Sequence, residues 1–169
     1  MTTNAPRKAF SKTTEHLDSC QLSTALTNEH ALSLAEMLAS SEPWASLKFS
    51  AASLASYLLR DDAALRRYAI LVDGNLAGVI CVRHPWLRGP YIELLGMSPG
   101  YRGRGIGRQV LAWAETEARY EAKNLWVIAS SFNHQALNFY QGLGFYPIGP
   151  IEGLVAPGFD EILLRKPLG

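Results

Sequence analysis

The sequence Arg-Gly-Arg-Gly-Ile-Gly-Arg at residues 102–108 lies between an apolar run ending at Met97 and a segment of helical periodicity. Alternating glycines allow a tight loop whose backbone amides converge on one place with no side chain in the way. The start of a helix adds unpaired N–H groups and a dipole that favours an anion, and arginines bind phosphate through charge-assisted hydrogen bonds. The loop therefore predicts a pyrophosphate site, and it requires a fold that leads a strand directly into a helix.

The hydrophobic pattern around this loop predicts further strands and helices. Asn28 is expected to cap the first helix, and the turn Asp73-Gly74-Asn75 is expected to join two antiparallel strands. Two prolines and a glycine within residues 83–90 predict a loop. Strands are expected over residues 20–26, 68–72, 76–82, 91–97, 125–129, 145–148 and 160–165, and helices over 28–43, 50–59, 105–121 and 133–141. This order predicts an α/β (α+β) fold, in which helices flank a mixed sheet.

Composition bounds the domain organisation. The 169 residues are 48% hydrophobic and 18% charged, which is typical of a globular domain that buries a core. Residues 1–19 are rich in Thr, Ser, Lys and Asn, so they are expected to form a mobile N-terminal arm. Residues 20–169 are then expected to form a single domain.

Charge and cysteine usage argue against several classes of partner. The formal net charge of +1 provides no overall field that would recruit nucleic acid or an anionic membrane. Cys20, Cys81 and the four histidines show no zinc-ligand spacing, so no metal is expected. No apolar run approaches the roughly 18 residues of a membrane-spanning helix, and the N-terminus has no signal-peptide pattern, which predicts a cytoplasmic protein. Whether the chain forms a homodimer is left open.

The spacing of the glycines narrows the identity of the pyrophosphate ligand. A Walker loop ends in Gly-Lys-Ser/Thr, whereas Ile106 follows Gly105. A dinucleotide-binding loop has the pattern Gly-x-Gly-x-x-Gly, whereas Gly103, Gly105 and Gly107 alternate. Both common nucleotide motifs therefore fit poorly. A plain glycine turn beside a solvated arginine cluster remains the alternative.

Two motifs resemble those of the GNAT superfamily of acyl-CoA-dependent N-acyltransferases. Arg102, Gly105 and Gly107 match its cofactor signature, Arg/Gln-x-x-Gly-x-Gly/Ala. Asn133 and Tyr140, followed by Gly-Phe at residues 144–145, are similar to its second signature. Taken singly, Asn133 could be a plain helix cap and Tyr140 an ordinary half-buried aromatic residue. The resemblance covers residues 68–165 and is strongest over residues 91–145.

The resemblance implies a GNAT-type, mostly antiparallel sheet in which strand four, residues 91–97, splays away from strand five, residues 125–129. The splay would hold the pantetheine arm of acetyl-CoA, with Leu95 and Met97 beside it and Asn133 hydrogen-bonded to it. Tyr140 would protonate the departing thiolate. The pyrophosphate would be held by the loop residues Arg102, Gly103, Arg104, Gly105, Ile106, Gly107 and Arg108.

The general base is less clearly indicated. Relatives that acetylate protein N-termini carry a glutamate at the position of Ile128, so their base is missing here. Because strand side chains alternate, Glu93 is expected to share a face with Leu95 and Met97, and Glu93 is the predicted base, acting through a water. Asp160 and Glu161 are interpreted as a solvated pair, with binding of a cationic acceptor as the alternative.

The resemblance thus implies an N-acetyltransferase that moves an acetyl group from acetyl-CoA to a primary amine by direct attack. A small-molecule amine or amino acid is the expected acceptor, because no charged surface tract suggests a large partner. Peptide or protein amines are the second interpretation. The third is a non-catalytic sensor that binds acyl-CoA and uses the fold for recognition only.

Overall fold

Eight strands within residues 6–169, the part of the chain that the computed structural model describes, form one sheet. Their order across the sheet is β1-β2-β3-β4-β5-β6-β8-β7, and only β5 and β6 pair in parallel. The predicted mixed, mostly antiparallel α/β fold is therefore confirmed. The strands are β1 (Thr14–His16), β2 (Gln21–Ser23), β3 (Leu65–Val72), β4 (Asn75–Trp86), β5 (Gly89–Met97), β6 (Asn124–Ser130), β7 (Tyr146–Glu152) and β8 (Asp160–Pro167).

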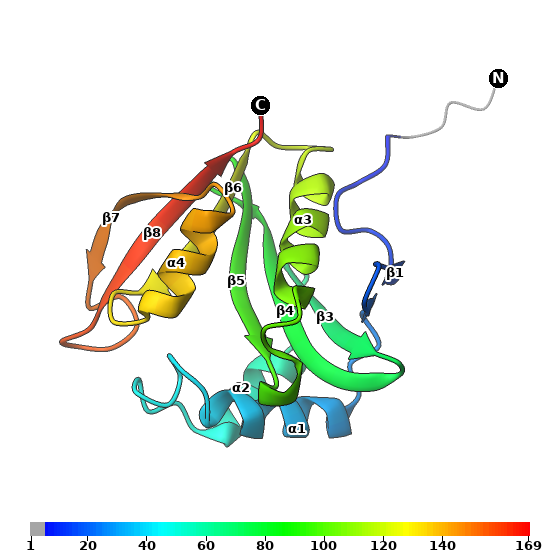
Figure 1. The fold of residues 1–169 in the computed structure, drawn as a ribbon, viewed down its shortest axis with the longest axis horizontal. Helices are drawn as coiled ribbons and strands as arrows, with labels where there is room; N and C mark the ends of the chain where they lie inside the picture. Colours follow the sequence, from blue (N-terminus) through cyan, green and yellow to red (C-terminus); the bar gives the residue numbers. More distant parts are fainter. Residues whose placement is uncertain (1–5) are drawn as a thin grey trace.

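The helices cover the two faces of this sheet. Figure 1 shows α3 (Ile106–Ala118) and α4 (His134–Gly142) in front of the sheet, with α1 (Asn28–Ala39) and α2 (Ala51–Leu59) at the bottom of the view. A short 3₁₀ turn, η1 (Pro99–Tyr101), leads from β5 toward α3. The cap of α1 is Thr27 and not the expected Asn28, because the Thr27 hydroxyl accepts the backbone N–H of His30 at 3.0 Å.

Two apolar clusters fill the space between helices and sheet. The first packs α3 and α4 against one face and includes Ile80, Ile92 and Val127. The second packs α1 and α2 against the opposite face and includes Cys81 and Leu94. Since Ile80 and Cys81 are adjacent in β4, the alternation of strand side chains assigns them to opposite clusters.

A β-bulge at Glu93 interrupts this alternation in β5. Cys81 lies opposite Leu94 while its neighbour Val82 lies opposite Ile92, so Glu93 is an extra residue without its own partner on β4. In a regular strand Ile92 and Leu94 would share a face, but Ile92 belongs to the α3 cluster and Leu94 to the α1 and α2 cluster. The bulge therefore changes which side chains of β5 face the same way.

The prediction of a loop over residues 83–90 is wrong. The strand β4 continues to Trp86, and β5 begins at Gly89, so the two form a tight hairpin. A register shift between Arg83 and Trp86 accommodates the proline-containing stretch within the ladder. Arg88 adopts a left-handed conformation with φ of 51° in the turn. Sheet pairing has here overridden local composition.

The parallel ladder between β5 and β6 is short. Tyr91 pairs with Trp126 and Ile92 with Val127, and within residues 6–169 these are the registered pairs of the two strands. On its other side β5 remains paired with β4 as far as Met97. The backbone of β5 after Ile92 therefore has a sheet neighbour on one side only.

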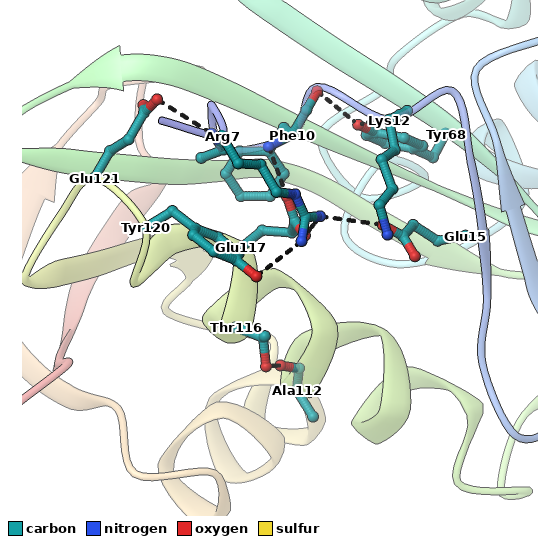
Figure 2. Close-up of polar contacts among 11 residues, drawn as sticks. Arg7, Phe10, Lys12, Glu15, Tyr68, Ala112, Thr116, Glu117, Tyr120 and Glu121 are labelled. Carbon is teal, nitrogen blue, oxygen red and sulfur yellow. Dashed lines mark hydrogen bonds and ion pairs between the residues drawn. The ribbon is translucent and has the colours of Figure 1, made fainter. Parts of the chain in front are cut away.

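The expected mobile arm over residues 1–19 is wrong for residues 6–19, and residues 1–5 lie outside the described part. Phe10 is 2% exposed and packs edge-on against the Trp113 ring, with 5.5 Å between the centroids. Figure 2 shows its backbone N–H donating to the buried Glu117 carboxylate at 2.8 Å, and the Tyr68 hydroxyl donating to its carbonyl at 3.0 Å. Arg7 forms an ion pair with Glu117 as well. Long-range contacts thus fix a segment whose composition is polar.

Replacing Phe10 by alanine tests this role of the N-terminal segment. Phe10→Ala should lower the free energy of unfolding by about 3–5 kcal/mol, because it empties a buried aromatic site. Urea denaturation measures the difference, with Phe49→Ala as the control, since Phe49 is 36% exposed and its loss should cost within about 1 kcal/mol. Equal stabilities of the two variants would restore the mobile-arm interpretation.

Candidate functional site

The glycine loop opens α3 as the sequence predicts. Gly103 and Gly105 have φ of 72° and 78°, a left-handed conformation that other residues adopt at a cost, and Gly105 is the N-cap of α3. A Cβ atom added at either glycine would meet no other atom within 4 Å, so the space above both is open. The helical ladder begins with the N–H of Gln109 donating to Gly105 at 3.2 Å. The preceding N–H groups of the first turn are therefore free to bind an anion.

The three arginines of the loop differ in what their side chains do. Arg102 donates from Nε to the Met97 carbonyl and from its terminal nitrogen to the Ser41 hydroxyl, both at 2.9 Å. It therefore fastens the loop to the end of β5 and to the α1–α2 connection. The Arg104 guanidinium lies over the Tyr101 ring, 5.3 Å from its centroid, and Arg108 is exposed. Arg104 and Arg108 are the two that leave positive charge at the rim of the loop.

Ile106 and Gly107 contribute backbone rather than side chains. The side chain of Ile106 is buried in the core, so only its amide faces the loop. A Cβ atom on Gly107 would lie 3.3 Å from the ring of Phe139 on α4. Gly107 thus lets the first turn of α3 approach α4 closely, which is a constraint that the loop motif alone does not indicate.

Leu95 and Met97 face the α3 side of β5. Both side chains are half-buried and pack against the cluster that α3 and α4 cover. Their strand has no registered partner on β6 at this point, since the parallel ladder ends at Ile92. An extended ligand would find backbone N–H and carbonyl groups along this edge.

Glu93 was expected to share a face with Leu95 and Met97, and this prediction is wrong. The bulge turns the Glu93 side chain to the other face of β5. Its carboxylate lies on the α1 and α2 side, where it accepts two hydrogen bonds from Arg83 at 3.1 and 3.2 Å. Arg83 also donates to Asp62 at 3.1 Å. Because the guanidinium engages both Glu93 oxygens, this carboxylate is poorly placed to take a proton from a substrate.

Helix α4 carries Tyr140, and its N-cap Asn133 lies two turns before that residue. The Asn133 side-chain oxygen accepts the Ala136 N–H at 3.2 Å, so Asn133 is a helix cap, and its NH₂ group is the part left for a ligand. Tyr140 is 7% exposed, and its ring packs against Phe139 and Phe145. Burial raises the pKa of Tyr140, so the phenol keeps its proton at neutral pH.

Sequence reasoning interpreted Glu161 as solvated and missed the buried pair that it forms on β8 with Ser130 on β6. The Ser130 hydroxyl is 2.8 and 3.1 Å from the two Glu161 oxygens, and Glu161 is 4% exposed rather than solvated. Burial raises the pKa of Glu161, and the Ser130 hydrogen bond partly offsets this. The signal in the sequence was the placement of Glu161 directly before the apolar run Ile-Leu-Leu.

Tyr91 on β5 lies near Glu161 and near the two predicted catalytic residues, Glu93 and Tyr140. Burial raises the pKa of the Tyr91 phenol, and the nearby charges of Glu93 and Glu161 and the Tyr140 hydroxyl raise it further. Glu93, Glu161 and Tyr140 thus each lie within electrostatic reach of the Tyr91 phenol. Tyr91 itself belongs to the short β5–β6 ladder, opposite Trp126.

Residues 6–169 offer neither a metal-binding cluster nor a membrane-spanning helix. In that part of the chain no three His, Cys, Asp or Glu side chains are grouped so that they could hold a metal ion. None of its helices combines the length and apolar character needed to cross a membrane.

Comparison with known sequences finds a family model and several relatives. The model of the acetyltransferase (GNAT) family matches residues 30–145. Streptothricin acetyltransferase of Streptomyces lavendulae is 36% identical over 88 residues, which are 50% of this chain and 47% of the relative. Blasticidin-S acetyltransferase of Streptomyces morookaense is 34% identical over 103 residues, which are 60% of this chain and 73% of the relative. The chain thus spans about half the length of the first relative.

Solved structures show the same fold. Nourseothricin acetyltransferase is 28% identical and superposes with a TM-score of 0.58 over 66% of this chain and 69% of its own. A ribosomal L7/L12 alpha-N-protein acetyltransferase in complex with coenzyme A is 16% identical, with a TM-score of 0.68 over 89% of this chain and 95% of its own. The second likeness concerns the fold alone.

The left-handed backbone at Gly105 generates a testable difference between two glycines. Gly105→Ala should lower the free energy of unfolding by roughly 1–2 kcal/mol, the cost of a left-handed conformation for a residue with a Cβ. Gly100→Ala is the matched control, because Gly100 has open space around it and no positive φ. Thermal unfolding of both variants gives the comparison. If both changes were neutral, the loop would not need glycine for its backbone.

Proposed function

Because the chain belongs to the acetyltransferase (GNAT) family, we propose that it transfers an acetyl group from acetyl-CoA to the primary amine of a small molecule. The observation that carries this proposal is the open loop at Gly103 and Gly105, which leads into the free N–H groups of α3. Coenzyme A has a pyrophosphate, which is the anion that such a loop is suited to bind. The residues present therefore fit the group.

The roles in holding acetyl-CoA follow from this fit. The amides of the loop and of the first turn of α3, from Gly103 to Arg108, would bind the pyrophosphate, with Arg104 and Arg108 adding charge. Arg102 would act by fixing the loop, since its own side chain is engaged with Met97 and Ser41. The free edge of β5 at Leu95 and Met97 would pair with the pantetheine arm, and the Asn133 NH₂ group would donate to it.

The bound group supplies an acetyl thioester, whose carbonyl carbon is the electrophile. Tyr140 is the residue that would donate a proton to the departing thiolate. Two observations support this assignment: α4 holds its ring between Phe139 and Phe145, and burial raises its pKa so that the phenol is protonated throughout the working pH range. A positioned general acid of this kind contributes about 10²–10⁴-fold to a rate.

The proposed acceptor is a small-molecule amine. The names of streptothricin acetyltransferase, blasticidin-S acetyltransferase and nourseothricin acetyltransferase each refer to a small molecule, which supports this choice. A thiol-release assay with acetyl-CoA tests it, using streptothricin and blasticidin S as the first acceptors and N-terminal peptides as the comparison. Turnover of peptides alone would contradict the small-molecule acceptor. Acetyl-CoA binding without turnover of any amine would indicate a sensor.

Acetyl-CoA should stabilise the protein against heat. A ligand that binds only the folded state at 100 times its Kd adds about 2.7 kcal/mol to the stability, which raises Tm by several degrees. Differential scanning fluorimetry measures the shift, with NAD as the control because the glycine spacing departs from a dinucleotide loop. A Tm raised by NAD and left unchanged by acetyl-CoA would refute the assignment of the loop.

Removing the Tyr140 hydroxyl should slow the chemical step. Tyr140→Phe is expected to lower kcat by about 10²–10⁴-fold, while the affinity for coenzyme A, measured by calorimetry, changes little. Tyr120→Phe is the control, since Tyr120 lies exposed beyond the far end of α3. A Tyr140→Phe enzyme within about threefold of the parent would mean that water protonates the thiolate.

A further inference from the structure

The Glu161 carboxylate is buried without a basic partner. Within residues 6–169, no Lys, Arg or His nitrogen lies within 4.0 Å of its oxygens, and its polar contact is the Ser130 hydroxyl. Asp160, which precedes it, is only half-buried. Three other carboxylates that are buried or half-buried do have basic partners. Glu117 is paired with Arg7, Glu93 with Arg83, and Glu115 with Lys166.

Such a group costs folding free energy. An ionised carboxylate in a low-dielectric site is unfavourable unless it is paired, and one neutral hydrogen bond compensates only part of that cost. Groups of this kind are concentrated at functional sites, where the fold tolerates them for their chemistry. Glu161 also lies outside residues 30–145, the part that the family model matches, so that match does not account for it.

The position of Glu161 links it to the site. It lies opposite Ser130 in the β6–β8 ladder. Ser130 shares a face of β6 with Trp126, the partner of Tyr91, because residues two or four apart in a strand point the same way. This face is opposite to the one that α3 and α4 cover, which includes Leu125 and Val127. Glu161 thus lies on the face of the β5–β6 ladder that is away from the one α3 and the predicted pyrophosphate loop cover.

We propose that Glu161, and not Glu93, is the general base that takes the proton from the acceptor, and that the acceptor is an alkylammonium cation. This inference rests on the proposed function. A buried carboxylate without a basic partner attracts a cationic amine, whereas a neutral arylamine would gain nothing from it. Because Glu161 is almost fully covered, the proton passes through one intervening water.

Glu161 and Tyr140 together account for every proton that moves in the transfer. The ammonium group gives one proton through water to Glu161, which frees the nitrogen lone pair. The nitrogen attacks the thioester carbonyl carbon, so that a C–N bond forms and the C–S bond breaks. The thiolate takes the proton of Tyr140, and the nitrogen returns its second proton to the Tyr140 oxygen. Glu161 releases its proton to solvent, and the products are the amide, coenzyme A thiol and one proton.

The groups that face Glu161 determine its titration. Tyr91 on β5 lies within electrostatic reach of it, and Glu93 and Tyr140 lie within reach of the same phenol. The β6 neighbour is Ser130, the β7 partner is Ile151, and Asp160 precedes it on β8. With no guanidinium or ammonium group of residues 6–169 in contact, burial raises the pKa of Glu161 above its ordinary value. The base is therefore protonated and inactive at low pH, and the rate should rise as the pH passes through the raised pKa.

Kinetics of matched glutamine variants test the assignment. Glu161→Gln should lower kcat/KM for the parent's best amine by roughly 10²–10⁴-fold and move the acid limb of the pH profile up toward the amine's own pKa, near ~10.4. Glu152→Gln removes an exposed carboxylate from the neighbouring β7 and should leave the profile unchanged. If Glu93→Gln showed the loss and Glu161→Gln did not, the base would be Glu93 and the proposal would be overturned.

Thermal stability provides a second test. The Glu161→Gln change should raise Tm if Glu161 acts as a base, and should lower Tm if its role is structural. Since folding raises the pKa of Glu161, the charged form opposes folding above the ordinary glutamate pKa of about 4.3, and the penalty disappears below it. Glu161→Gln should therefore raise Tm at pH 7 by roughly 2–4 °C, and this gain should vanish below about pH 4. A less stable variant at pH 7 would assign Glu161 a structural role instead.

If the unmodified protein acetylated no amine, the proposed function would be contradicted. The binding of an alkylammonium cation beside Glu161 could still be tested by NMR. In protein labelled with ¹³C at the glutamate carboxyl, the resonance lost in Glu161→Gln identifies Glu161. Addition of n-pentylamine to the protein loaded with coenzyme A should shift that resonance in the parent. An unshifted resonance would overturn the assignment whatever the turnover.

Discussion

The sheet is continuous across its middle through two residue pairs, Tyr91 with Trp126 and Ile92 with Val127. Two parallel pairs contribute little, so the two halves must be held together mainly by side-chain packing. The α3 cluster provides this packing, because it includes Ile80 and Ile92 from one half and Val127 and Leu164 from the other. A backbone edge can therefore stay free in the centre of the protein without separating the halves. The proposed binding of pantetheine and the proposed roles of Tyr140 and Glu161 all depend on that interruption.

Local sequence patterns predicted the features that local geometry determines. The loop glycines were recognised because Gly103 and Gly105 must adopt left-handed backbone and because a helix must follow them. The fold class followed from the order of apolar segments in the same way. The prediction that Glu93 shares a face with Leu95 and Met97 was wrong because a bulge sets the orientation of Glu93. A bulge depends on how β4 and β5 align. The alternation of apolar residues in the β5 sequence does not indicate that Glu93 is an extra residue.

Glu161 was misjudged for a related reason. Glu161 was expected to be solvated, but its strand β8 lies between β6 and β7, and β7 is the outer strand. Which of the last two strands is inside cannot be derived from their sequences, since β7 and β8 both alternate poorly. The partner that explains Glu161, Ser130, is 31 residues away in the chain. The same limit applies to Phe10, whose polar surroundings in sequence gave no sign of its contacts with Glu117 and Tyr68.

The hydrogen bond between Phe10 and Glu117 can form only late in the synthesis of the chain. The two residues are 107 positions apart, so the binding place of Phe10 does not exist until most of the protein has left the ribosome. At about 5–20 residues per second, Phe10 waits for roughly 5–20 s with its ring in water. The polar residues that follow it, Ser11 to Glu15, keep this early segment hydrated meanwhile. A composition typical of disorder is thus suited to the nascent chain, even though the same segment is ordered once folding is complete.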